Sequence, residues 1–490
     1  MAGSTIAEGG RGFDPFIVSN SHEKHDTATR KRIRSHAKRG KSHQKPTVPR
    51  LKAGTWINGH ESDADSKEIR NGREIPFVQT QFAGSDLTVT RFAFDNMQPY
   101  MLDLIFKFCT VIKQSMYPIE LCVAFDYRGS IWFQYLQSDP MYLHSTLWTS
   151  QAYFDQVKGQ GSSLASMNHE ANTLHLLQRR MVNPKIATTD ITIAVVVTLV
   201  MMTIILGNHE AARKHMAGLH MIVNMRGGLH VLKENSQLQI KVCRADLVIA
   251  LVNGTRPLFF SKSISWEPYL PLPKLNHSAL AIQIPCLKKD IRLAAVWTDL
   301  RQFCTAANVA LQTDQKIHPE VYQEILISIE YRLVHLETCN DLSLEILHLA
   351  ILAFSTTVYL QGEGVRVRYH NLSRQLHNSI LHLGASNQTP DLWLWILFVA
   401  AISAVPHEDD QWLMPLLRAA LQRIGTTTWE PVRDILKSIM WIDALHDKDG
   451  KRVFDTALSV DYSTGKTTQP PEHVKIMPST FYPHYPITSC

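Results

Sequence analysis

An almost unbroken apolar run, ITIAVVVTLVMMTIILG, extends from Ile191 to Gly207 and limits the folds open to this chain. Three structures accommodate such a run: a membrane span, a β-strand or a buried helix. The run is shorter than the roughly 20 residues that cross a bilayer, and no basic or aromatic belt flanks it. Its many β-branched residues are typical of a strand. However, Asp190 and Asn208 bracket it and an amphipathic helix follows, which favours a central helix buried on all sides.

The next stretch, Gly207 to Leu229, contains signals for the start, the buried face and the end of one helix. Asn208 is a residue type that accepts hydrogen bonds from the free amides of a helix N-terminus. Gly227 suits the left-handed conformation that ends many helices. Apolar residues recur between them at the spacing of one helical face: Ala212, Met216, Leu219, Ile222 and Val223.

Several catalytic motifs are incomplete in this chain. His209 and His215 are six residues apart, which places them about 120° apart around a helix, so they cannot share one zinc ion. The glycines at 227–228 precede no Lys-Ser/Thr, as a phosphate loop requires. The residues 318–320 lack the P-C-x-x-C of a deaminase, and 447–450 lack the first carboxylate and closing Glu of a calcium loop. The sequence therefore predicts no enzyme, no metal site and no cofactor.

Helical periodicity continues along most of the chain. Pro99, Pro319, Pro390 and Pro431 fall where first helical turns are expected, since proline is tolerated there. No series of alternating segments joined by Asn-Gly turns predicts a large sheet. The sequence therefore predicts an all-α fold, with further helices starting at Pro99 and over 163–181, 291–311, 319–338, 343–361, 370–383, 390–404, 409–424 and 430–446.

The basic charge of the chain is concentrated near its start. The chain has 490 residues and a net charge of +6. The segment Arg30 to Lys45 holds eight Lys/Arg and no acidic residue. The rest of the chain therefore has 42 basic residues against 44 acidic ones. We expect a disordered basic arm over 1–85, a large helical domain over 86–465 and a tail over 466–490. Three interpretations of the arm stay open: a nuclear-import signal, a weak nucleic-acid contact, or a solvated tail. Its candidate residues are Arg30, Lys31, Arg32, Arg34, Lys38, Arg39 and Lys41.

Several strings, taken in order, resemble the helical regulatory domain of fungal-specific transcription factors, which often follows a zinc binuclear cluster. The most specific is the Gly-x-x-x-Ala, His-x-x-Gly-Leu and Arg-Gly-Gly-Leu pattern within 188–229. The basic stretch TRKRIRSHAKR at 29–39 is similar to one that many members without the zinc cluster carry. The other strings that carry the resemblance lie at 142–154, 168–181, 243–259, 391–405 and 429–455.

The resemblance implies a nuclear protein that controls transcription through a helical domain. The chain departs from the family in its seven cysteines, of which no two are closer than Cys109 and Cys122. A zinc binuclear cluster needs two C-x-x-C pairs, so this chain cannot form one. The implied partners are transcriptional proteins, with weak DNA contact through the arm, no membrane, and homo-oligomerisation left open. The alternative is a cytosolic helical scaffold or ligand-binding protein.

Three charged residues fall in the most family-like strings: Arg226, Asp246 and Arg256. They could line a pocket for a ligand or a partner. The simpler interpretation, which we favour, is a buried pair between Arg226 and Asp246 that fixes how two helices meet. The tryptophans of the C-terminal half are expected to pack in the core rather than bind a cofactor.

Overall fold

The computed structural model describes residues 97–113, 118, 121–123, 130–260, 264–270, 284–313, 315–337, 341–359, 367, 369–384, 388–404 and 412–459. All the helices below lie within Ile75–Cys490. The predicted basic arm (1–85), with its seven candidate residues, and the predicted tail (466–490) lie outside the described residues.

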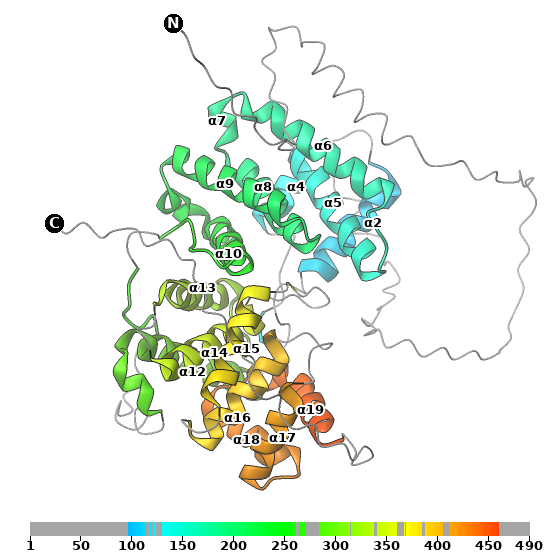
Figure 1. The fold of residues 1–490 in the computed structure, drawn as a ribbon. Coiled ribbons are helices and arrows are strands. Elements are labelled where there is room, and N and C mark those ends of the chain that lie inside the picture. The colour runs from blue at the N-terminus through cyan, green and yellow to red at the C-terminus, as the bar shows by residue number, and fades with distance from the viewer. Residues whose placement is uncertain are drawn as a thin grey trace, which may run out of the picture. The chain divides into compact units, whose positions relative to one another are not determined.

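The all-α prediction is confirmed (Figure 1). The described residues form sixteen α-helices and no β-strand, and a single β-bridge joins Cys122 and Ile317. Short π-helices at Phe108–Ile112 (η1) and Ala400–Ala404 (η5), and 3-10 helices at Leu229–Asn235 (η2) and Pro285–Lys289 (η3), complete the described elements. The α-helices are α2 (Pro99–Lys107), α4 (Ile131–Ser138), α5 (Pro140–Val157), α6 (Leu164–Met181), α7 (Pro184–Ala187), α8 (Asp190–Ile205), α9 (His209–Arg226), α10 (Ser236–Asn253), α12 (Ile291–Thr313), α13 (Pro319–His335), α14 (Leu342–Tyr359), α15 (His370–Leu383), α16 (Pro390–Val399), α17 (Leu413–Ile424), α18 (Trp429–Ile439) and α19 (Asp443–Ser459).

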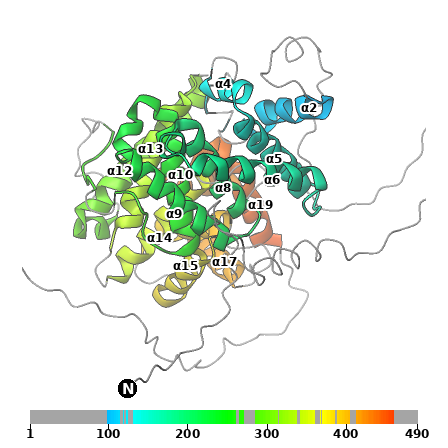
Figure 2. The ribbon, with the colours of Figure 1, turned by 90° about the horizontal axis from the view of Figure 1, so that it is seen from above.

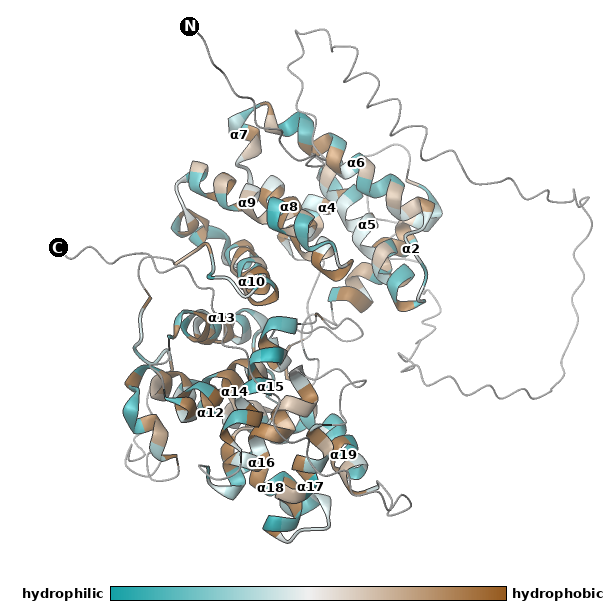
Figure 3. Ribbon diagram, in the orientation of Figure 1, coloured by the Kyte–Doolittle hydropathy of each residue, from teal (hydrophilic) through white to brown (hydrophobic). Residues whose placement is uncertain are grey.

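The apolar run forms α8, a core helix, as predicted. Its side chains are buried around its whole circumference, against α5, α9 and α10. Apolar residues also make up most of α14 and α16 (Figure 3). Of the described helices, α14 is the one long and apolar enough to cross a membrane by length and composition, and 72% of it is buried inside the fold.

The amphipathic helix is also confirmed, including both of its ends. The Asn208 side chain accepts a hydrogen bond from the backbone amide of Ala211 at 3.1 Å. Gly227 ends α9 with φ +116°, a left-handed conformation that favours glycine. The buried residues of α9 are the five of the predicted stripe. Helix α10 contacts α8, α9, α13 and α15, so it joins the earlier helices to the later ones (Figures 1 and 2).

The single helix predicted over 430–446 is wrong, because the chain there forms two helices, α18 and α19. The break occurs at Met440, which adopts extended φ and ψ of −160° and 119°. The carbonyl of Met440 thereby accepts a hydrogen bond from the indole nitrogen of Trp395 at 2.7 Å. Trp395 is fully buried, so its N–H requires an acceptor inside the core. Tertiary structure meets that requirement, and local periodicity carries no sign of it.

Gly450 lies in the interior of α19, where two tryptophan rings approach its backbone. A Cβ at this position would lie 2.7 Å from Cζ2 of Trp441 and 2.8 Å from Cη2 of Trp429. Both rings are buried, so neither moves without disturbing the core. We expect Gly450→Ala to lower the free energy of unfolding by about 1–2 kcal/mol, although alanine favours a helix. Chemical denaturation measures this change.

Gly218 provides the matched control. It lies inside α9, and a Cβ there would meet nothing within 4 Å. Gly218→Ala is therefore expected to raise the free energy of unfolding by about 0.5–1 kcal/mol, through helix propensity alone. If both alanine variants stabilise the protein, the close approach at Gly450 is incorrect.

Candidate functional site

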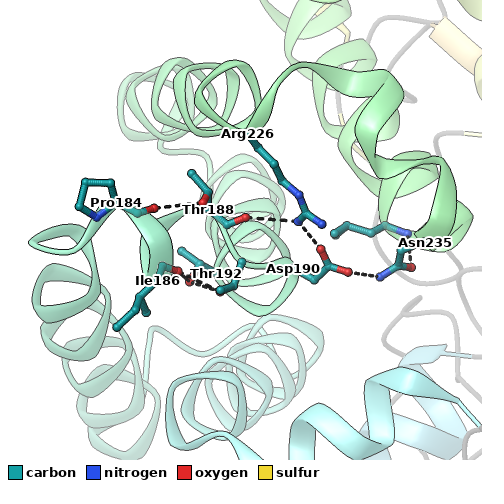
Figure 4. Close-up of polar contacts among 9 residues, drawn as sticks. Pro184, Ile186, Thr188, Asp190, Thr192, Arg226 and Asn235 are labelled. Atoms are coloured by element: carbon teal, nitrogen blue, oxygen red, sulfur yellow. Dashed lines mark hydrogen bonds and ion pairs between the residues drawn. The ribbon is translucent and has the colours of Figure 1, made fainter.

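The structure places Arg226 beside Asp190 rather than beside Asp246, so the predicted pair is wrong (Figure 4). The Arg226 guanidinium also donates to the carbonyl oxygen of Thr188 at 3.3 Å. The other Asp190 oxygen accepts from the Asn235 side chain at 2.8 Å. Arg226 and Asp190 therefore join the end of α9 to the start of α8 and to η2, which is a structural role.

Asp246 is buried in α10 and accepts three hydrogen bonds, none of them from an arginine. The backbone amides of Leu258 and Phe259 donate to it at 2.8 Å and 3.0 Å. The Tyr331 hydroxyl of α13 donates at 2.9 Å. Burial is the largest influence on its carboxyl and raises its pKa. Asp246 thus attaches the segment that follows α10 to the helix itself and to α13.

Arg256 forms an ion pair with Glu337, and both side chains are exposed, at 70% and 75%. A pair so exposed contributes little to stability, since water and salt screen it. Arg226, Asp246 and Arg256 therefore have separate partners, and the structure does not bring them together into one pocket.

A group of cations that the sequence patterns do not indicate lies where α10 meets α4 and the end of η1. Lys241 and Arg244 come from α10, and Lys113 follows η1. Lys113 and Arg244 are only 5% and 7% exposed, and Lys241 is half-buried. We call these three residues the buried cationic cluster. In sequence they are one lysine beside an apolar stripe and two basic residues in an apolar helix, and nothing local indicates that they meet.

Aromatic rings line the cluster. The Lys241 ammonium nitrogen lies 3.5 Å from the ring centroid of Trp132, and that of Lys113 lies 5.7 Å from the same ring. The Arg244 guanidinium lies 5.2 Å from the ring centroid of Tyr359, the last residue of α14. Cation–π contacts of this kind contribute about 2 kcal/mol when desolvated. They offset part of the cost of burying the charges.

Among the described residues, carboxylates do not offset the remaining cost of burying Lys241 and Arg244. Neither Lys241 nor Arg244 forms an ion pair, and the Arg244 Nε is buried without a hydrogen-bond acceptor, in the part of the chain that the structure describes. The buried carboxyl of Glu330 does not compensate either, because desolvation raises its pKa to about 8. Burying an ion costs several kcal/mol, and neighbouring like charges repel one another.

The pKa values of both lysines reflect their burial first. Desolvation lowers the pKa of Lys241 well below its ordinary value, and Lys113 and Arg244 lower it further. Desolvation also lowers the pKa of Lys113. A neighbouring anion would act in the opposite direction and raise both pKa values, since it favours the charged form of each lysine.

Two histidines and a tyrosine form a second polar group. The Nδ1 atoms of His144 and His169 lie 2.9 Å apart, and the Tyr100 hydroxyl lies 3.2 Å from Nε2 of His169. Desolvation, followed by the charge of His144, lowers the pKa of His169 to about 4. Within the described ranges no three His, Cys, Asp or Glu side chains are placed to hold a metal ion. This group is therefore a packing contact between α2, α5 and α6.

Comparisons of the chain with protein-family models, with curated proteins and with solved structures returned no match. What the chain does is therefore inferred from its residues and their geometry.

Proposed function

We propose that this protein is a nuclear regulator of transcription that lacks a zinc cluster of its own and acts through its helical domain. The observation that supports the proposal is the all-α fold, because it is the fold that the resemblance implies. The strings that carry the resemblance lie in α5, α6, α8, α9, α10, α16, α18 and α19. Among these helices, α5 contacts α6 and α8, and α8 contacts α9 and α10.

Contact with DNA is assigned to the basic arm rather than to the helices. The arm contains eight Lys/Arg within 16 residues, and each cation that meets a phosphate releases counterions. Such clusters are also the signals that nuclear-import receptors bind as extended chains. Binding of transcriptional protein partners is assigned to the folded domain.

The arm is tested by replacing Arg30, Lys31, Arg32, Arg34, Lys38, Arg39 and Lys41 with glutamine in a tagged chain. We expect nuclear accumulation to be lost, because the import signal loses its charge, while the melting temperature stays almost unchanged. Fluorescence microscopy and thermal denaturation measure the two effects.

A control variant carries the same number of neutralised cations on exposed helix and loop positions: Arg179, Lys185, Arg213, Lys233, Lys288, Arg374 and Lys448. This control is expected to enter the nucleus normally. If the arm variant also enters the nucleus and still regulates, the arm is a solvated tail. If the arm variant unfolds instead, residues 30–45 belong to the folded domain and the predicted boundary at 85 is wrong.

A second candidate function is a cytosolic helical protein that binds a small ligand. The buried cationic cluster favours it, since it holds the Arg244 Nε, which has no acceptor among the described residues, beside the Lys241 ammonium group, and such perturbed buried groups are candidates for a ligand site. The two functions differ in location, so diffuse cytosolic fluorescence of the unaltered chain would favour the second.

A further inference from the structure

We propose that Lys241 and Arg244, together with Lys113, form a binding site for a phosphate group, free or carried on a small molecule. Phosphate is thus the ligand class expected at the buried cationic cluster. Phosphate binding is compatible with a nuclear or a cytosolic protein, so failure of phosphate binding and failure of the nuclear proposal are separate results.

The strongest support is Arg244. A guanidinium has five N–H donors and remains charged inside a protein, so burial without an acceptor is costly. Arg244 is 7% exposed and packs over the ring of Tyr359, and within the described part of the chain its Nε has no acceptor. A phosphate at this position would accept from the guanidinium and supply the missing negative charge.

The two lysines supply the remaining donors. Both ammonium groups lie near the same indole ring, that of Trp132, and they influence one another directly. Trp132 is held in place by its own N–H, which donates to Gln237 at 2.5 Å, and by stacking on Tyr142. Both lysines therefore lie over one rigid aromatic surface, the ring of Trp132.

The number and type of charges favour phosphate over a single carboxylate. Three cations are matched better by a group with a charge near −2 than by one of −1. A phosphate also presents three or more acceptor oxygens in different directions, which suits donors that arrive from separate elements. Because Lys241 is half-buried while the other two residues are enclosed, the ligand would enter at Lys241.

Binding would also link parts of the chain that are distant in sequence. Lys113 lies at the end of η1 and Trp132 on α4, whereas Lys241 and Arg244 lie on α10, beside the end of α14. An anion shared by these residues would stabilise the contact of η1 and α4 with α10. The site thereby couples ligand binding to the packing of the helices.

The experiment compares melting temperatures in millimolar inorganic phosphate with those in sodium chloride of equal ionic strength. We expect phosphate to raise the melting temperature of the unaltered protein saturably, by about 3 °C or more near a hundred times the Kd. Lys241→Met should lose this shift. Lys233→Met removes an exposed lysine and should keep the full shift, which also corrects for the general stabilising effect of phosphate on proteins.

The melting temperature of Lys241→Met without phosphate distinguishes an anion site from a purely structural role of the cluster. If Lys241 only packs against Trp132, Lys241→Met lowers the melting temperature in chloride. If Lys241 instead belongs to an anion site, Lys241→Met removes a positive charge that has no bound anion in chloride. The melting temperature in chloride then stays the same or rises. Should Arg244→Met fail to fold, Lys241→Met and calorimetric titration of the unaltered protein with phosphate still decide the question.

Further ligands distinguish the source of the phosphate. Stabilisation by glycerol phosphate as well as by inorganic phosphate indicates a phosphate carried on a small molecule, and stabilisation by inorganic phosphate alone indicates the free ion. The proposal is overturned if succinate alone stabilises the protein. It is also overturned if phosphate shifts the unaltered protein and Lys241→Met by the same amount.

Discussion

Asp299→Asn is expected to lower the free energy of unfolding by about 3–5 kcal/mol, the largest effect of any single change predicted for this protein. Asp299 of α12 and Arg332 of α13 are 0% and 1% exposed, and the guanidinium donates to the carboxylate at 2.6 Å. The same carboxylate accepts from the backbone amides of Tyr269 and Leu270 at 2.8 Å and 3.0 Å. Asparagine keeps the shape of the side chain but leaves the Arg332 charge buried without compensation. Denaturant unfolding with tryptophan fluorescence measures the loss.

Two further variants show whether the uncompensated charge of Arg332 causes the loss of stability in Asp299→Asn. The double variant Asp299→Asn, Arg332→Met no longer contains the uncompensated cation, and it is expected to be no less stable than Asp299→Asn alone. Arg256→Met breaks the exposed pair with Glu337 and should change stability by less than about 0.5 kcal/mol. If Asp299→Asn costs no more than Arg256→Met, the buried pair is not formed as described.

His446→Gln is expected to reduce the dependence of stability on pH in mild acid. His446 of α19 is buried, and desolvation lowers its pKa to about 3. Its Nδ1 accepts from the backbone amide of Ile442 at 3.1 Å, so Nε2 carries the proton and donates to the Thr357 hydroxyl at 2.9 Å. Protonation of Nδ1 would replace the first hydrogen bond with a contact between two donors.

The sign of the effect follows from the two pKa values. The folded-state pKa lies below the ordinary 6.5, so between about pH 6.5 and pH 3 the unfolded chain binds a proton at this residue and the folded chain does not. The contribution of His446 to stability is therefore complete above pH 6.5 and is lost as the pH falls. The loss amounts to about 1.4 kcal/mol per pH unit, or about 3 kcal/mol between pH 6.5 and pH 4.5.

Unfolding free energies measured at several pH values over this interval test the prediction. Other histidines with lowered pKa, among them His169 and His348, add to the slope of the unaltered protein, so the informative quantity is the difference in slope. His382→Gln is the control, because His382 is exposed on α15 and should leave the slope unchanged. Equal slopes for His446→Gln and the unaltered protein would contradict a buried neutral histidine.

The functional residues divide into those that local patterns indicate and those that only contacts reveal. Asp246 stands out by its position in a family-like string, but its partners are two amides 12 and 13 residues later and a tyrosine 85 residues later. Periodicity and propensity describe neighbours within a few turns, so they could not identify these partners. The cluster of Lys113, Lys241 and Arg244 gives no local signal for the same reason, since Lys113 is separated from the other two by more than a hundred residues of chain.

Local sequence signals predict several of the helices correctly. The core position of α8, the Asn208 cap and Gly227 end of α9, and the five buried residues of α9 follow from hydrophobic spacing and from the backbone preferences of single residues. The partners of buried polar groups, by contrast, depend on how the helices pack. The predicted helix is interrupted at Met440, whose carbonyl oxygen accepts a hydrogen bond from the indole N–H of Trp395. Arg226 pairs with Asp190 instead of Asp246. The physical reason is that a buried donor or charge must be satisfied by whichever group the packed helices bring near it, and that group need not be close in sequence.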